Sequence, residues 1–239
     1  MDIDNLTVIL LAGDPKCLKL IPPDQAESYL TRASRATLAL ECPMILVHHP
    51  EVVSMKGAPS VRRVPAGRNV LESVMAGLQA CQTDFALVVA TDLPLINTPA
   101  IRDFLAKIGH DQSDVSIALA DHEACRQLGH ETRRPIPLDG RHYKFGSVFL
   151  LRTQARDQIL SVYQELHGLR KQVVRLVLRF VPFTNIVKGL RFAATFKLKR
   201  LASSRLALRL SEVEDLVWCQ TGLRVRGILA SPSLVIDHD

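Results

Sequence analysis

The chain has 239 residues, of which 47% are hydrophobic and 23% are charged. This composition predicts a globular protein with a substantial core and excludes a disordered chain. The net charge of +6 is unevenly distributed, because eleven Lys or Arg and no Asp or Glu lie between Leu166 and Ser211. Outside that segment there are 19 basic and 24 acidic residues, so the rest of the chain is mildly acidic.

Five scattered cysteines form no C-x-x-C pair. This pattern favours reduced thiols and argues against a zinc ribbon or a disulfide framework. No basic segment precedes an apolar stretch at the N-terminus, and no apolar run approaches the ~18 residues of a spanning helix. We therefore expect a cytoplasmic protein.

The first predicted strand, residues 7–11, is apolar and is followed by the loop Ala12-Gly13-Asp14-Pro15-Lys16. Small residues there let a ligand approach the backbone, and Lys16 could meet a phosphate. A plain turn with a solvated lysine is the alternative. A helix over residues 25–40 and strands at 44–47 and 61–64 follow.

A second helix is predicted from Val70 to Leu78, where apolar residues recur on one face. Gly67 and Asn69 lie at its start, where free backbone N–H groups and the helix dipole favour an anion or a polar base edge. Ser73 lies one turn further on the same side. The alternative is an ordinary capped helix with an exposed Ser73.

The run Phe85–Ala90 is continuously apolar, as is typical of a strand buried on both faces. It ends in Thr91-Asp92, so a carboxylate follows a central strand at the edge where α/β sheets bind ligands. Asn97 then caps a helix that Gly109 ends. A strand, an acid and a helix in this order suit a metal-bound phosphate, whereas the alternative is an Asp92 that only caps the turn before Pro94.

The second half of the chain is less regular. We expect a strand at 114–120, a polar substrate-facing loop from Asp121 to Arg141, a strand at 147–151 and a helix from Thr153 that Gly168 ends. Residues 170–210 read as basic amphipathic helices. A capping box at Ser211 opens a last helix closed by Gly222, and strands at 223–229 and 234–236 lead to terminal carboxylates. The alternation predicts one α/β domain over 1–239, with a doubly wound, mainly parallel sheet and a basic helical insert at 168–210.

Three motifs together carry a resemblance to a known family. They are Leu11-Ala12-Gly13, the segment Gly67-Arg-Asn69-Val-Leu-Glu-Ser73 before Gly77-Leu78, and Ala90-Thr-Asp92-Leu-Pro94-Leu95. In this order and spacing the chain resembles the molybdenum-cofactor-guanylyltransferase-like (MobA-like) nucleotidyltransferases, which have the Rossmann-like nucleotide-diphospho-sugar transferase fold. The resemblance implies transfer of a nucleotidyl group from a nucleoside triphosphate to a sugar or alditol phosphate, with release of pyrophosphate and with Mg²⁺ as the cofactor.

The resemblance also implies roles for individual residues. Asp92 and Lys16 would be catalytic, and Asp92 would share the metal with Asp237 or Asp239. Gly146 and Ser147 would border the acceptor. The nucleotide would be contacted by Leu11, Ala12, Gly13, Gly67, Asn69, Ser73 and Thr91.

The first loop departs from the family pattern Gly-x-Gly-x-Arg-Met. It has no second glycine, and no arginine occurs before Arg32, so Lys16 or Lys19 would have to serve as the family's later lysine. A catalytically degenerate nucleotide-binding protein of the same fold is therefore one alternative. A family-A glycosyltransferase acting at a membrane surface, through Asp92 and the basic helices, is another.

The basic segment 170–210 has several interpretations of its own. A helical subdomain packed on the sheet with its basic side in solvent is the simplest, and a lid, a homodimer contact and a platform on anionic lipid are the others. About 1 kcal/mol per Lys or Arg near an acidic membrane makes peripheral attachment at the inner face feasible. Nucleic acid is disfavoured, because the phenylalanines of this segment lie on its apolar faces.

Overall fold

The computed structural model describes residues 5–13, 28–49, 61–109, 111–130, 135–169 and 209–237. The strands are β1 (Leu6–Ala12), β2 (Met44–His48), β3 (Val61–Pro65), β4 (Phe85–Ala90), β5 (Val115–Asp121), β6 (Ile136–Leu138), β7 (Arg141–Arg152) and β8 (Val225–Leu229). The helices are α2 (Tyr29–Leu38), α3 (Val70–Ala80), α4 (Thr98–Ile108), α5 (His122–Gln127), α6 (Arg156–Leu169) and α9 (Leu210–Thr221), with 3-10 turns η2 (Thr153–Ala155) and η4 (Pro232–Leu234).

The strands form one mixed sheet in the order β3-β2-β1-β4-β7-β5-β8, and β6 pairs with β7. β1 runs parallel to β2 and β4, β2 to β3, and β5 to β8. β7 alone among the described strands of the main path is reversed, because it is antiparallel to both β4 and β5. The predicted doubly wound, mainly parallel α/β sheet is confirmed.

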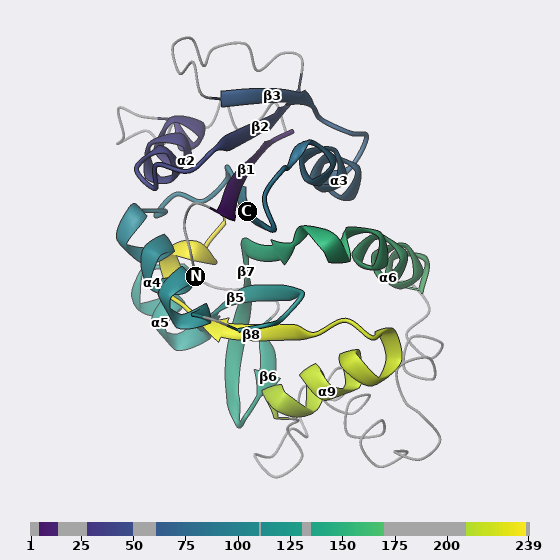
Figure 1. Ribbon diagram of the computed structural model, residues 1–239. Helices are drawn as coiled ribbons and strands as arrows, with labels where there is room; N and C mark the ends of the chain where they lie inside the picture. Colours follow the sequence, from purple (N-terminus) through teal and green to yellow (C-terminus); the bar gives the residue numbers. More distant parts are fainter. Residues whose placement is uncertain are drawn as a thin grey trace.

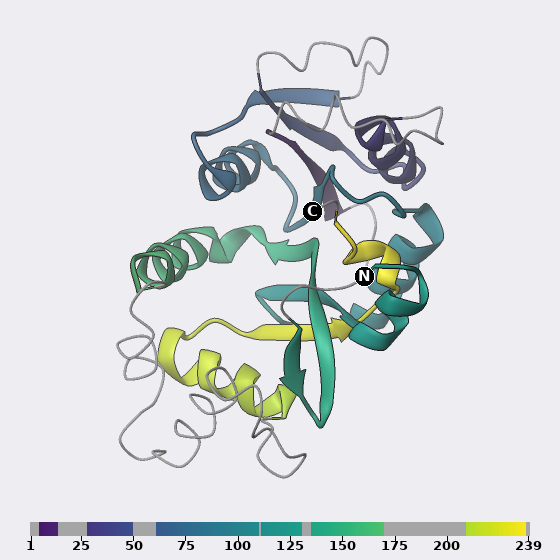
Figure 2. The ribbon, with the colours of Figure 1, turned by 180° about the vertical axis from the view of Figure 1, so that it is seen from behind.

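Helices cover both faces of this sheet (Figures 1 and 2). On one face α2 and α4 bury side chains such as Leu30 and Phe104 against the strands. On the other face α3 and α6 do the same with Met75, Leu78 and Leu160. Because β1 and β4 are parallel neighbours, their carboxyl ends meet at one edge, which is where the candidate site lies.

Local sequence rules account well for β4 and α4. β4 spans Phe85–Ala90 as predicted, and the interior residues of its apolar run are buried. The Asn97 side chain accepts a hydrogen bond from Ala100 N at 2.9 Å, which caps the first turn of α4. The helix ends at Gly109, whose φ of 59° favours glycine.

The loop predicted between Asp121 and Arg141 is wrong within the described residues. The Asp121 carboxylate accepts from Glu123 N at 2.8 Å and thereby starts α5. β6 follows and pairs with β7 through a turn in which Asp139 and Gly140 have positive φ. β7 therefore begins at Arg141 and not at residue 147, so Gly146 lies inside a strand.

Three further boundaries differ from the sequence predictions. α6 continues through Gly168 to Leu169. The last helix is capped two residues before Ser211, because Glu212 accepts from Arg209 N at 2.8 Å. Residues 234–236 form no strand, because Leu234 ends the 3-10 turn η4 and residues 235 and 236 follow it outside any element. Of the predicted basic helical segment 170–210, residues 170–208 lie outside the described residues.

Glu214, which the predicted capping box would have used, instead covers the exposed edge of the sheet. Its Oε1 accepts from Gly227 N on β8 at 2.7 Å. Burial raises the pKa of Glu214, although this hydrogen bond and nearby Arg226 act in the opposite direction. An acid with a raised folded-state pKa contributes stability below its unfolded pKa and loses it as the pH rises through the folded value.

We therefore expect Glu214→Gln, which keeps an oxygen acceptor but carries no charge, to gain stability relative to the wild type as the pH rises from about 4 to about 7. Thermal unfolding of both proteins at the two pH values measures this. A difference in melting temperature that is independent of pH would contradict the prediction.

Two further findings concern the described part of the chain. Cys42, Cys81, Cys125 and Cys219 are free thiols. None of the helices there is both long enough and apolar enough to cross a membrane.

Candidate active site

A pocket of about 390 Å³ opens at the carboxyl edge of the sheet, between the ends of β1 and β4 and the start of α3. Seven of its ten described lining residues are ones that the sequence singles out. Those seven are Leu11, Gly13, Gly67, Asn69, Ser73, Thr91 and Asp92. Three motifs that lie far apart in the sequence thus share one cavity.

Thr91 joins the two strand ends that form the floor of the pocket. Its backbone N–H and its hydroxyl both donate to the Leu11 carbonyl, at 3.3 Å and 2.9 Å. Thr91 is buried, whereas Asp92, the next residue, is half-buried and lines the pocket. The turn after β4 is therefore fixed to β1, which holds the Asp92 backbone in place.

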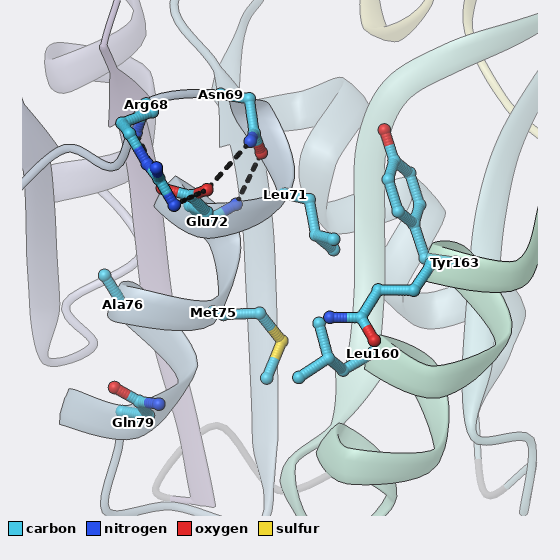
Figure 3. A pocket seen from close by; sticks show the side chains of 10 residues that line it. Arg68, Asn69, Leu71, Glu72, Met75, Ala76, Gln79, Leu160 and Tyr163 are labelled. Atoms are coloured by element: carbon cyan, nitrogen blue, oxygen red, sulfur yellow. Dashed lines mark hydrogen bonds and ion pairs between the residues drawn. The ribbon is translucent and has the colours of Figure 1, made fainter. Parts of the chain in front are cut away.

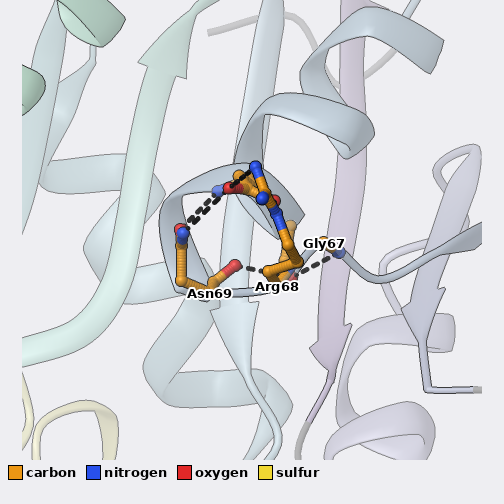
Figure 4. Close-up of polar contacts among 5 residues, drawn as sticks. Gly67, Arg68 and Asn69 are labelled. Atoms are coloured by element: carbon orange, nitrogen blue, oxygen red, sulfur yellow. Dashed lines mark hydrogen bonds and ion pairs between the residues drawn. The ribbon is translucent and has the colours of Figure 1, made fainter.

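The loop before α3 folds back on the first turn of the helix (Figure 4). Gly67 N donates to Ser73 Oγ at 3.1 Å, and the Ser73 hydroxyl donates to the Asn69 carbonyl at 3.0 Å. The Asn69 side chain accepts from Glu72 N at 2.9 Å and caps α3. A Cβ at position 67 would lie 2.2 Å from the Glu72 Cβ, so only glycine fits here.

Ser73 is buried, so the alternative of an accidentally exposed serine is wrong. We expect Ser73→Ala to lower the free energy of unfolding by roughly 1–2 kcal/mol, because Gly67 N would lose its acceptor in a partly buried loop. Chemical denaturation measures this, with Gln79→Ala on the exposed side of α3 as the control. An unchanged stability would mean that water replaces the hydroxyl.

Arg68 also lines the pocket, although the sequence motifs did not single it out. Its Nε lies 3.2 Å from Glu72 Oε2, and its Nη2 lies 3.1 Å from Glu72 Oε1. The hydrogen bond from Arg68 is the main reason why the pKa of Glu72 is below its usual value. Arg68 is the one cationic side chain in the described lining, and its place inside the Gly67–Asn69 motif was the available signal.

A second hollow of about 660 Å³ lies between α3 and α6 (Figure 3). It shares Arg68 and Asn69 with the first pocket, and Tyr163 stands opposite them. Its walls include Leu71, Met75 and Leu160, and Glu72, already paired with Arg68, is its one described acid. Although it is larger, it lacks a strand-end carboxylate, so the smaller pocket suits phosphate chemistry better.

Other predicted residues lie outside the described lining of the first pocket. Ala12 is fully buried at the end of β1. Gly146 and Ser147 lie on β7, and a Cβ at Gly146 would lie 2.6 Å from Val235 Cγ1 and 2.8 Å from the Leu234 carbonyl oxygen. Lys16 and Asp239 fall outside the described residues.

Asp237 contacts a residue that the sequence did not indicate. Its Oδ1 accepts from Lys144 Nζ at 2.5 Å. Lys144 pairs with Ala120 across β7 and β5, and its charge opposes the burial that raises the pKa of the Cys125 thiol on α5. The C-terminal segment thus packs across β7 at Gly146 and reaches Lys144.

The donor chemistry for a divalent cation can be judged from the described acids. No group of three or more His, Cys, Asp or Glu side chains gathers among the residues that the structure describes. Mg²⁺ is usually held by one or two carboxylates, with waters and substrate phosphates as its other ligands. A carboxylate at the end of a central strand beside a pocket therefore fits this ion.

Comparison with known proteins agrees with the family resemblance and with the predicted fold. The model of the MobA-like NTP transferase domain matches residues 12–179. Comparison with curated proteins found no match.

Among solved structures, a hypothetical transferase from Thermus thermophilus has a TM-score of 0.76 at 20% identity, covering 98% of this chain and 97% of that one. A 4-diphosphocytidyl-2C-methyl-D-erythritol synthase from Anaerococcus prevotii DSM 20548 has a TM-score of 0.53 at 11% identity, with coverages of 99% and 91%. A CMP:2-keto-3-deoxy-manno-octonic acid synthetase complexed with CTP has a TM-score of 0.53 at 13% identity, with coverages of 95% and 90%. At these identities the likeness shows the fold, which is that of the nucleotide-diphospho-sugar transferases, as predicted.

Proposed function

The chain belongs to the family of MobA-like NTP transferase domains, and from this premise we propose that it transfers a nucleoside monophosphate from a nucleoside triphosphate to a small phosphorylated acceptor. The acceptor class is a sugar or alditol phosphate. The other product is pyrophosphate.

The observation that carries this proposal is the pocket shared by the three motifs. Gly13 and Gly67 line the cavity with their backbone, and Asp92 lines the same cavity. A nucleoside needs a polar, close-fitting wall, and a triphosphate needs a cation at the edge of the sheet. The pocket offers polar residues for a nucleoside and a carboxylate for a cation within one space.

In the proposed reaction an oxygen of the acceptor phosphate attacks the α-phosphorus of the triphosphate. A new P–O bond forms there, and the bond from the α-phosphorus to the oxygen bridging to the β-phosphorus breaks, so that pyrophosphate leaves with that electron pair. The reaction requires little covalent chemistry from the protein, which orients the two substrates and balances their charge. Asn69 and the backbone at Gly67 would orient the base, and Arg68 would add positive charge to the pocket.

Asp92 would hold the Mg²⁺, and Asp237 is the second predicted ligand. When bound, the ion would neutralise charge that develops on the phosphate oxygens. The place of Asp92 in the lining of the pocket supports this role.

Pyrophosphate release tests the proposal. The assay combines each of the four NTPs with a panel of sugar and alditol phosphates, with and without Mg²⁺. CTP comes first, because a structural neighbour was solved with it. Hydrolysis of a nucleotide sugar, without use of any NTP, would instead favour a family-A glycosyltransferase.

A nucleotide-binding protein without turnover is the second candidate, and the shortened first loop favours it. That loop lacks the second glycine and the arginine of the family pattern. An NTP that raises the melting temperature but yields no pyrophosphate with any acceptor would support this candidate. Turnover with one acceptor would exclude it.

A cytoplasmic location, a homodimer and contact of residues 170–210 with anionic membrane stay predictions from the sequence.

A further inference from the structure

Lys144 is a largely enclosed cation at the same edge of the sheet as Asp92. Its side chain is 16% exposed and that of its partner Asp237 is 31% exposed. An ammonium group has three N–H donors, and among the described residues Lys144 has Asp237 as its one acceptor. Two donors at a nearly enclosed position are thus left for another anion.

Stability alone explains this ion pair poorly. Removing both charges from water costs about as much as their attraction returns, so such pairs add little to folding. Lysine is also a common phosphate ligand in proteins, where it acts as a point charge. A lysine held by one carboxylate and short of acceptors is therefore arranged for binding.

The sheet order decides which substrate Lys144 can meet. β4 lies between β1 and β7, and the nucleotide pocket lies on its β1 side. Val89 of β4 pairs with Val148 of β7, so the residues that precede Val148 extend past the carboxyl end of β4, which Asp92 follows in the chain. Lys144 is among them, on the β7 side of β4, whereas the pocket lies on the β1 side.

We propose that Lys144 contacts the phosphate of the acceptor and that Asp237 acts as its positioning residue. This inference rests on the proposed nucleotidyl transfer and assigns the acceptor's anion to β7. It also gives Asp237 a role through Lys144, in place of the metal ligation that the family resemblance implies.

Steady-state kinetics with the active NTP and acceptor test this assignment. Lys144→Met should raise the KM of the acceptor at least about tenfold while the KM of the NTP changes less than about twofold. Lys144→Arg should restore most of the acceptor affinity, because it keeps the charge. Asp237→Asn should raise the KM of the acceptor in the same direction without changing the Mg²⁺ requirement. Lys107→Met, at an exposed lysine paired with Asp103, is the matched control and should change neither KM.

A KM increase for the NTP alone in Lys144→Met would overturn the proposal. So would an Asp237→Asn variant that needs more Mg²⁺ at an unchanged acceptor KM.

A binding experiment separates this inference from the proposed reaction. Calorimetric titration with inorganic phosphate, in the presence of a saturating non-hydrolysable NTP, should give a Kd at least about tenfold weaker for Lys144→Met than for the wild type. Absence of pyrophosphate with every acceptor would remove the proposed reaction, whereas the phosphate titration would still decide the role of Lys144. A wild-type protein that binds no phosphate at about 10 mM, or a variant that binds it equally well, would overturn the inference.

Discussion

Asp92→Asn is expected to lower kcat for pyrophosphate release by about 10²- to 10³-fold, the usual cost of removing one electrostatic group that stabilises the transition state. Asparagine keeps the size of the side chain but has no charge for a divalent cation. The backbone should stay in place, because Thr91 remains hydrogen-bonded to the Leu11 carbonyl. The melting temperature should therefore stay close to that of the wild type, and the stabilisation that Mg²⁺ adds to the NTP complex should be lost.

Asp84→Asn is the matched control, since Asp84 precedes β4 at the opposite end of the same strand. Its carboxylate accepts from Asn5 Nδ2 at 2.6 Å and lies away from the pocket lining. This variant should keep its activity and its response to Mg²⁺. Wild-type turnover in Asp92→Asn would show that Asp92 takes no part in the reaction. Robust turnover would also exclude the second candidate function, a nucleotide-binding protein without turnover.

Local rules in the sequence predict those elements whose ends are marked by their own residues. β4 is an uninterrupted apolar run, and α4 has Asn97 at one end and Gly109 at the other. The predicted strand 147–151 begins six residues too late, because Arg141–Phe145 is largely polar and carries no strand signal of its own. It is a strand because β6 and β5 pair with it on either side, and such tertiary context overrides propensity.

The site likewise has residues that the sequence could identify and a contact that it could not. Asp92 and Gly67 could be found because each stands at the end of a strand or the start of a helix, and parallel neighbours bring such ends together. The pairing of Lys144 with Asp237 joins residues 93 positions apart and depends on the reversed direction of β7. No short motif encodes that contact, so it could not be predicted from the sequence.

Gly146→Ala is expected to lower the free energy of unfolding by about 2–3 kcal/mol, at the upper end of the usual cost of overpacking. For a chain of this size that corresponds to a melting temperature lower by roughly 5–10 °C. The added Cβ would lie 2.6 Å from Val235 Cγ1, 2.8 Å from the Leu234 carbonyl oxygen and 2.9 Å from the Ala118 carbonyl oxygen. Two of these three atoms belong to the backbone, so no side-chain rotation relieves the contacts.

Gly140→Ala, in the turn before the same strand, separates crowding from backbone strain. Gly140 has a φ of 72°, and a methyl group added there would have no neighbouring atom within 4 Å, so alanine should cost only about 1 kcal/mol. Adding Val235→Ala to Gly146→Ala should recover part of the stability, because it removes the closest contact but leaves both carbonyl oxygens.

Displacement of the C-terminal segment should also separate Asp237 from Lys144, so the acceptor KM should rise in Gly146→Ala and stay unchanged in Gly140→Ala. Equal losses of stability in the two glycine variants would show that the segment after η4 moves freely, and the close packing that brings Asp237 to Lys144 would then not hold in solution.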